Sequence, residues 1–262
     1  MNRRNGVPLI VLYHSISPCD EDPFQVTVRP QRFREQMDWL ARRGLRGTSV
    51  GEVLAAHREG RSGGVVALTF DDGYADFAEY ALPVLQEYGF SATLFALSGR
   101  PGGWNAWDAG GPRKPLLTED GLRAVAAAGL EIGSHGSMHV RLPALGEAQL
   151  QDEVVGSRER LRDVTGQDVA GFCYPWGDVS RREADVVGAA GYDYACAVWH
   201  TRLSSRYALP RTYVHDGDSG WRLDAKRLRH VLTSTGRLRL LRPRPPAPPE
   251  GQSATLVPGG SA

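Results

Sequence analysis

The stretch LTFDDGYADF, Leu68 to Phe77, decides the fold and raises the question of function. It continues the apolar run VVAL, and together they predict a buried strand over 65–70. Asp71 and Asp72 then stand side by side. Adjacent carboxylates at the end of a buried strand repel each other and are costly to desolvate unless something compensates them. A bound metal ion is one explanation, and a loop turning back into solvent is the other.

Strand-like and helix-like segments alternate along the chain on both sides of this stretch. Strands are expected at 8–14, 65–70, 92–97, 131–135, 170–175 and 194–198. Helices are expected at 31–43, 49–57, 76–88, 118–129, 147–165, 180–190 and 221–232. This alternation indicates a mainly parallel sheet with helices outside it, either a barrel or an open doubly wound sheet. In both, the site lies at the carboxyl ends of the strands.

Two of the helices begin with a capping-box pattern, in which a serine is followed three residues later by glutamate. Ser49 and Glu52 form one, and Ser180 and Glu183 form the other. Between 31 and 43 the apolar residues recur at helical spacing, which predicts a helix with one buried face.

Composition narrows the class of protein. The 262 residues are enough for one large α/β domain or two small ones, and a net charge of +1 gives no general attraction to nucleic acid or anionic membranes. Three scattered cysteines favour a reducing compartment. We find no apolar run long enough for a transmembrane segment and no convincing signal peptide, so a cytoplasmic location is expected. The oligomeric state is not indicated.

Groups that bind metals or move protons stand at the ends of the expected strands. His14 ends the first, the aspartate pair ends the second, and His135 and Tyr174 close later ones. His139 follows His135 by four residues in SHGSMH, so both imidazoles can face one ion. Such a pair of histidines is weak evidence alone and much stronger beside an aspartate pair.

One carboxylate and two imidazoles form a donor set suited to Zn²⁺ with positions left open for water. Fe²⁺, Co²⁺ and Ni²⁺ accept the same donors. One aspartate then binds the metal, and the other is left beside the bound water, where its natural role is that of a general base.

In order, the motifs TFDDG, SHGSMH, FCYPWG and LPR resemble those of the polysaccharide deacetylases, the chitooligosaccharide deacetylase-like esterases of carbohydrate esterase family 4. The likeness runs over roughly residues 7–224. It implies a distorted (β/α) barrel with about seven strands that uses a divalent metal to remove N-acetyl, or sometimes O-acetyl, groups from sugars. A catalytic domain is expected over 1–235, and the basic, then proline-rich composition of 236–262 predicts a disordered tail. By the resemblance Asp71 is the catalytic base, and the metal ligands are Asp72, His135 and His139.

FCYPWG departs from the commonest family pattern, because Cys173 stands where many members have arginine. The chain is similar to a subset in which an arginine of the later LPR segment holds the catalytic aspartate, and Arg211 fits that role. The alternative is a surface arginine after a turn. The substrate groove is expected to be lined by Tyr174, Pro175, Trp176 and Gly177. The backbone amide of Tyr174 is a candidate oxyanion donor. For Trp176, packing and sugar stacking are both open.

Deacetylation must protonate a leaving amine, and histidine is the usual donor. The late Leu-x-His motif of many members is missing here. His14, in an early Tyr-His that resembles members acting on poly-N-acetylglucosamine, is the favoured donor. His215 is the rival, and a purely structural role is open for both.

Trp104 and Trp107 lie in an irregular loop where they can stack on sugar rings or simply pack the loop. Three functions compete. The first is an N-deacetylase acting on an N-acetylated sugar, and the second is a hydrolase of a cyclic imide, ureide or other small amide. The third is a non-catalytic carbohydrate-binding module, which the complete set of motif residues disfavours.

Overall fold

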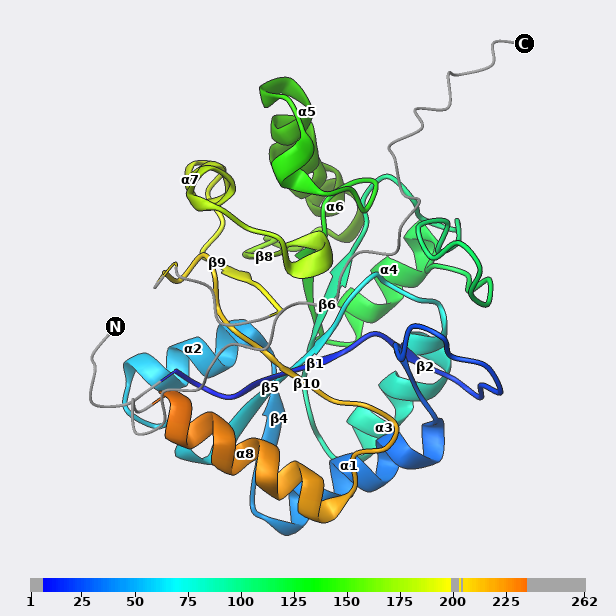
Figure 1. Ribbon diagram of the computed structural model, residues 1–262, viewed down its shortest axis with the longest axis vertical. Coiled ribbons are helices and arrows are strands. Elements are labelled where there is room, and N and C mark those ends of the chain that lie inside the picture. The colour runs from blue at the N-terminus through cyan, green and yellow to red at the C-terminus, as the bar shows by residue number, and fades with distance from the viewer. Residues whose placement is uncertain (1–6, 199–202, 204, 235–262) are drawn as a thin grey trace.

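The computed structural model describes residues 7–198, 203 and 205–234, in which helices surround a curled parallel sheet (Figure 1). The expected tail at 236–262 lies outside the described residues. The strands are β1 (Ile10–Tyr13), β2 (Ser15–Ile16), β3 (Thr27–Val28), β4 (Arg46–Thr48), β5 (Val65–Phe70), β6 (Thr93–Ala96), β7 (Glu131–Ser134), β8 (Gly171–Cys173), β9 (Tyr194–Cys196) and β10 (Thr212–Tyr213).

Most helices lie where the sequence predicts them. The α-helices are α1 (Pro30–Arg42), α2 (Val50–Arg58), α3 (Leu82–Glu87), α4 (Glu119–Ala127), α5 (Glu147–Gln151), α6 (Ser157–Thr165), α7 (Arg181–Ala189) and α8 (Gly220–Ser234). Shorter helical segments are η1 (Ser62–Gly64), η2 (Phe77–Ala81), η3 (Leu142–Ala144), η4 (Asp152–Gly156) and η5 (Pro175–Gly177). Both predicted capping boxes are confirmed at the starts of α2 and α7. Among the described helices, none combines the length and apolarity needed to cross a bilayer.

Seven parallel strands form a half-barrel in the order β10-β1-β5-β6-β7-β8-β9, which confirms the expected distorted barrel. β4 adds to the amino-terminal half of β5, on the edge that β6 occupies further along. The two outer strands come together through the chain before β10, because Leu209 forms a parallel bridge with Cys196 of β9. The segment after this bridge, which carries Arg211, is therefore held between both edges of the sheet.

The two faces of β5 belong to different packing layers, as the two-residue period of a strand requires. Val66, Leu68 and Phe70 pack in the larger core, which includes the buried face of α1. Ala67 lies on the opposite face, in a smaller cluster with residues of β1, β6, β8 and β9. The inner face of the half-barrel is thus closed by a few apolar side chains.

Two predicted continuous helices are interrupted. The helix expected at 76–88 begins as the π-helix η2 and continues as α3. Pro83 explains the interruption, because proline has no N–H to bond the carbonyl one turn earlier. The helix therefore widens ahead of Pro83. The helix expected at 147–165 contains the π-helix η4 between α5 and α6. The sequence does not predict β2, β3, β4 and β10, because two or three residues carry no periodicity signal.

Candidate active site

β5 ends in a sharp turn that directs its two aspartates to different partners. The N–H of Asp71 still donates to the carbonyl of Tyr13, at 3.0 Å. Asp72 then has a φ of 72° and Gly73 a φ of 75°. A left-handed conformation costs a non-glycine residue about 1 kcal/mol or more. A Cβ at Gly73 would also lie 3.3 Å from the Cβ of Ala96, so glycine completes the turn.

Three metal-ligand atoms converge beyond this turn. Oδ1 of Asp72 lies 3.3 Å from Nε2 of His135 and 3.3 Å from Nε2 of His139. All three side chains are buried, and Oδ1 of Asp72 has no hydrogen-bond partner among the described residues. Tetrahedral zinc with N and O ligands at about 2.0–2.1 Å separates the ligand atoms by about 3.3 Å. The spacing and the orphaned oxygen therefore fit a bound divalent ion.

The second nitrogen of His135 fixes which nitrogen faces Asp72. Its Nδ1 lies 2.9 Å from the carbonyl oxygen of Cys173. Because a carbonyl only accepts, Nδ1 carries the hydrogen and Nε2 presents its lone pair, as a metal ligand requires.

His139 is held by aromatic neighbours. Its ring stacks on Trp107 with 4.3 Å between centroids, and Trp176 meets it edge-on at 5.0 Å. Both His139 and Trp176 have positive φ, at 59° and 63°. Burial lowers the pKa of His139 and keeps the imidazole neutral, which is the form that binds metals.

The loop that carries His139 is anchored from η4. The carboxylate of Glu153 accepts the backbone N–H of Ser137 at 2.7 Å and that of Met138 at 3.2 Å. This anchor holds the two residues directly before His139.

The other aspartate, Asp71, forms a buried pair with Arg211. Two guanidinium nitrogens of Arg211 lie 2.7 Å from its two carboxylate oxygens. Burial raises the pKa of Asp71, but the charge of Arg211 outweighs it and lowers the pKa below its usual value. The remaining hydrogens of Arg211 go to the hydroxyl of Thr69, the sulfur of Cys173 and the carbonyl of Ala197.

Both candidate proton donors contact one tyrosine. Nδ1 of His14 lies 3.2 Å from the hydroxyl of Tyr213. His215 stacks its ring on Tyr213 at 4.3 Å between centroids, and its backbone N–H donates to Asp218 at 2.8 Å. Charges on Asp72 and Asp71 act on His14, which places it at the same end of the sheet as the metal-ligand cluster.

Tyr174 is placed differently from the expectation. Its side chain is fully buried and its hydroxyl donates to the carbonyl of Tyr207 at 2.9 Å, so it is part of the core and lines no groove. Its backbone N–H donates to the carbonyl of Cys196, at 3.2 Å, and is therefore already occupied. The amide expected as a candidate oxyanion donor therefore bonds the neighbouring strand β9 in this structure, because its pairing continues one residue past the end of β8.

The other three residues of the expected groove wall differ in how far they are buried. Pro175 is buried, while Trp176 and Gly177 are partly exposed. Of the loop tryptophans, Trp107 reaches the cluster through His139, whereas Trp104 is 40% exposed and lies under the guanidinium of Arg113 at 4.6 Å.

Asp108, next to Trp107, lies within the same site. Its carboxylate is 3.4 Å from the hydroxyl of Tyr74 and 3.4 Å from the amide nitrogen of Asn105. Burial, with a contribution from the charge of Asp72, raises the pKa of Asp108 to about 6.

Sequence reasoning missed several contacts that hold the site, although strand periodicity could have found two of them. Thr69 lies two residues before Asp71, and Tyr213 lies two residues after Arg211. Residues two apart in a strand share a face. Once Asp71 and Arg211 are placed on the inner face, Thr69 and Tyr213 are therefore expected on that face as well. The anchoring of the His139 loop by Glu153 had no signal of this kind.

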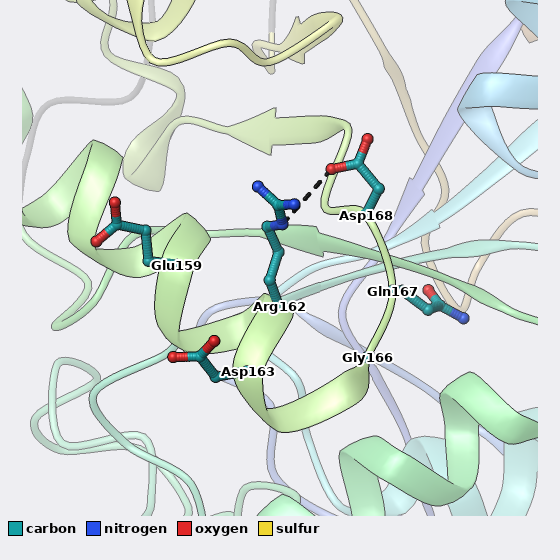
Figure 2. A pocket seen from close by; sticks show the side chains of 6 residues that line it. All are labelled: Glu159, Arg162, Asp163, Gly166, Gln167 and Asp168. Atoms are coloured by element: carbon teal, nitrogen blue, oxygen red, sulfur yellow. Dashed lines mark ion pairs between the residues drawn. The ribbon is translucent and has the colours of Figure 1, made fainter.

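A separate hollow lies at the other end of the sheet, after α6 (Figure 2). It is lined by Glu159, Arg162, Asp163, Gly166, Gln167 and Asp168. The amide of Gln167 bonds the backbone of Leu130 and Ile132, which places the hollow beside the amino end of β7. No predicted site residue lines it.

Comparison with known proteins finds similarity to polysaccharide deacetylases. Residues 58–195, just over half of the chain, match the family model for polysaccharide deacetylases. YxkH of Bacillus subtilis, whose name places it among the polysaccharide deacetylases, is 29% identical over 216 residues, covering 80% of this chain and 72% of that protein. The poly-β-1,6-N-acetyl-D-glucosamine N-deacetylase of Escherichia coli K12 is 33% identical over 84 residues, covering 31% of this chain and 12% of that protein.

Solved structures share the fold. The Streptococcus pyogenes deacetylase PplD in complex with acetate superposes with a TM-score of 0.71 at 21% identity, over 84% of this chain and 98% of that chain. BC0361, a polysaccharide deacetylase from Bacillus cereus, gives a TM-score of 0.69 at 20% identity, over 84% of this chain and 68% of that chain. At these identities the comparison shows a common architecture.

Proposed function

The chain belongs to the polysaccharide deacetylase family, and we propose that it is a metal-dependent hydrolase that removes N-acetyl groups from an amino sugar, an oligosaccharide or a glycoconjugate. One observation carries the proposal: a three-residue metal-ligand cluster adjoins an aspartate clamped by a buried arginine. The Escherichia coli relative named for poly-β-1,6-N-acetyl-D-glucosamine supports an N-acetylated sugar as the substrate class.

Asp72, His135 and His139 are the residues that would hold the metal. A divalent ion at these donors supplies a Lewis acid and lowers the pKa of a coordinated water. Zinc suits two imidazoles and one carboxylate best, and Co²⁺, Ni²⁺ and Fe²⁺ accept the same donor types.

Asp71 accepts the proton of the attacking water. Each of its carboxylate oxygens bonds one guanidinium nitrogen of Arg211 and keeps a further lone pair for that proton. The bidentate contact keeps the carboxylate ionised and holds its plane. Arg211 therefore acts on the reaction through Asp71.

His14 supplies the proton that the leaving nitrogen needs as its bond to the acetyl carbon breaks. The oxygen of water ends in acetate, one water proton passes to Asp71, and the amine leaves with the proton of His14. Trp107 and Trp176, which both pack on His139, offer aromatic surfaces for the C–H faces of a sugar ring.

The test is release of acetate by the zinc-loaded protein. The panel contains N-acetylglucosamine, its β-1,4 and β-1,6 oligomers of increasing length, and a cyclic imide. We expect acetate from at least one N-acetylated sugar, loss of that activity with a chelator and its return with zinc. Ring opening of the imide without acetate release from any sugar would contradict the proposal, as would full activity in protein shown to be free of metal.

A further inference from the structure

The short segment from Arg211 to Tyr213 carries two side chains that touch the proposed base and the proposed acid. β10 runs parallel to β1 at the edge of the sheet. Arg211, just before it, bonds Asp71, and Tyr213 contacts His14. Because residues two apart in a strand share a face, one segment positions both proton-moving groups.

The two neighbours of the Tyr213 hydroxyl determine which group donates and which accepts each hydrogen bond. Its hydroxyl lies 3.1 Å from the carbonyl oxygen of Gln25 and 3.2 Å from Nδ1 of His14. A carbonyl only accepts, and a phenol has a single hydrogen. The O–H therefore donates to Gln25, and the phenolic oxygen accepts the Nδ1–H of His14. Nε2 of His14 has no hydrogen bond within the described part of the chain.

The carbonyl that sets this direction is itself held in place. Gln25 has a φ of 55°, and such strain persists where the surroundings over-determine the backbone. Asp22 fixes the loop, since its carboxylate accepts the N–H of Val26 at 3.1 Å and that of Thr27 at 2.8 Å.

We propose that Tyr213 is a positioning residue for His14: it accepts the Nδ1–H, fixes the tautomer and orientation of the ring, and leaves Nε2 to donate to the leaving nitrogen. The inference rests on His14 acting as the acid of the proposed deacetylation. A neutral acceptor stabilises the imidazolium less than a carboxylate would, so the Nε2 proton remains easy to give up. Burial raises the pKa of Tyr213, which keeps it a neutral phenol.

The same geometry separates the two histidines that the sequence left as rivals. His215 contributes its ring face to Tyr213, and the Nδ1 of His215 is buried without a hydrogen-bond partner among the described residues. His215 thus packs against Tyr213 and supports it. Tyr213 in turn fixes the tautomer of His14.

Tyr213→Phe keeps the ring and its stacking on His215 and removes only the hydroxyl. We expect kcat on an N-acetyl sugar to fall about 10- to 100-fold, as is typical when a partner that orients a functional histidine is lost. An activated aryl acetate, whose leaving group needs no proton, should lose much less. Tyr192→Phe is the matched control, because it removes a buried hydroxyl whose partners are the carbonyl of Val154 at 2.9 Å and the hydroxyl of Ser157 at 3.4 Å rather than His14.

The pH profile gives a second readout. Activity that needs protonated His14 falls as the pH rises through its pKa. Removing the acceptor of Nδ1–H destabilises the imidazolium, so this fall should move to lower pH in Tyr213→Phe. Burial lowers the pKa of His14 in the wild-type protein, and the charged groups acting on it stay in place in the variant: Asp72 and Asp71 raise this pKa, and Arg211 and His135 lower it.

A ¹⁵N NMR measurement on the imidazole of His14 needs no turnover. Neutral His14 should carry its hydrogen on Nδ1 in the wild-type protein and in Tyr192→Phe, and should lose this preference in Tyr213→Phe. An unchanged tautomer in Tyr213→Phe, or equal rate loss on both substrates, overturns the proposal. If the wild-type protein releases no acetate from any sugar, the proposed function fails while the NMR result still judges the positioning role.

Discussion

Two charged regions at opposite ends of the sheet differ in how their charges are held. At the carboxyl ends of the strands, the side chains of Arg211 and Asp71 are 0% and 3% exposed and joined by two hydrogen bonds of 2.7 Å. In the hollow beside the amino end of β7, Arg162 and Asp168 lie 3.7 Å apart with side chains 51% and 68% exposed (Figure 2).

This difference in burial indicates which of the two regions is suited to catalysis. An exposed pair is screened by water and contributes about 0–1 kcal/mol to stability. A buried pair interacts strongly, and loss of one partner leaves an uncompensated charge. Charge is common to both regions, but only the first holds its charges desolvated and in fixed geometry.

Backbone strain separates the regions in the same way. In the described part of the chain, four residues other than glycine have positive φ. They are Gln25, Asp72, His139 and Trp176. Asp72 and His139 belong to the metal-ligand cluster, Trp176 packs on it, and Gln25 accepts the hydrogen bond of Tyr213. The hollow has only Gly166 in this conformation, where it costs little.

The largest expected effect comes from removing a metal ligand. His139→Ala should abolish acetate release and reduce bound zinc from about one equivalent to near zero, since two ligands remain where three are needed. Metal content by mass spectrometry and acetate release are the measurements. Asp168→Asn in the hollow is the control, with both quantities unchanged. Full activity in His139→Ala would erase the distinction between the two regions.

Next in size is the loss of the proposed base. Asp71→Asn should keep the metal but lower kcat by about 10²–10⁴-fold, because an amide cannot take the proton of water. Its free energy of unfolding should also fall, since Arg211 stays charged and buried without its partner. Asp72→Asn is the matched variant and should lose the metal. If Asp71→Asn loses metal while Asp72→Asn retains it, the two roles are reversed.

Removing the proposed acid sharpens the comparison within the active site itself. His14→Ala should lower kcat on an N-acetyl sugar by about 10²–10⁴-fold with zinc content intact. An activated aryl acetate should suffer much less. His215→Ala is the companion variant, and leaving-group dependence appearing there instead would assign the donor to His215.

The smallest expected effect is on stability. The folded pKa of Asp108, about 6, lies above the ordinary value of about 3.9, so ionisation destabilises the fold increasingly as the pH rises from about 4 to 6 and fully above it. Asp108→Asn should therefore raise the midpoint of thermal unfolding at pH 8 and lose most of that gain at pH 4. The measurement uses chelator-treated protein, because a cation would offset the charge of Asp72. An equal gain at both pH values would show that desolvation of the charge is not the cause.

The sequence alone determined the parts of this protein that depend on local pattern. Alternating apolar segments predicted the parallel sheet, and the serine–glutamate pairs predicted two helix starts that the structure confirms. The motif resemblance predicted the family and the barrel. These signals are readable because periodicity, capping and motif order all lie within short stretches of chain.

Tertiary structure decided the long-range contacts that no motif predicted. The motif resemblance predicted that Arg211 meets Asp71 across 140 positions, but it gave no sign that Tyr213 reaches His14 across 199. That second contact forms because the chain before β10 touches both edges of a curled sheet. Tyr174 looked like a groove residue and is core, since its N–H and hydroxyl both find partners inside the fold. Sheet closure and hydrogen-bond satisfaction are properties of the whole fold, so no local stretch of sequence encodes them.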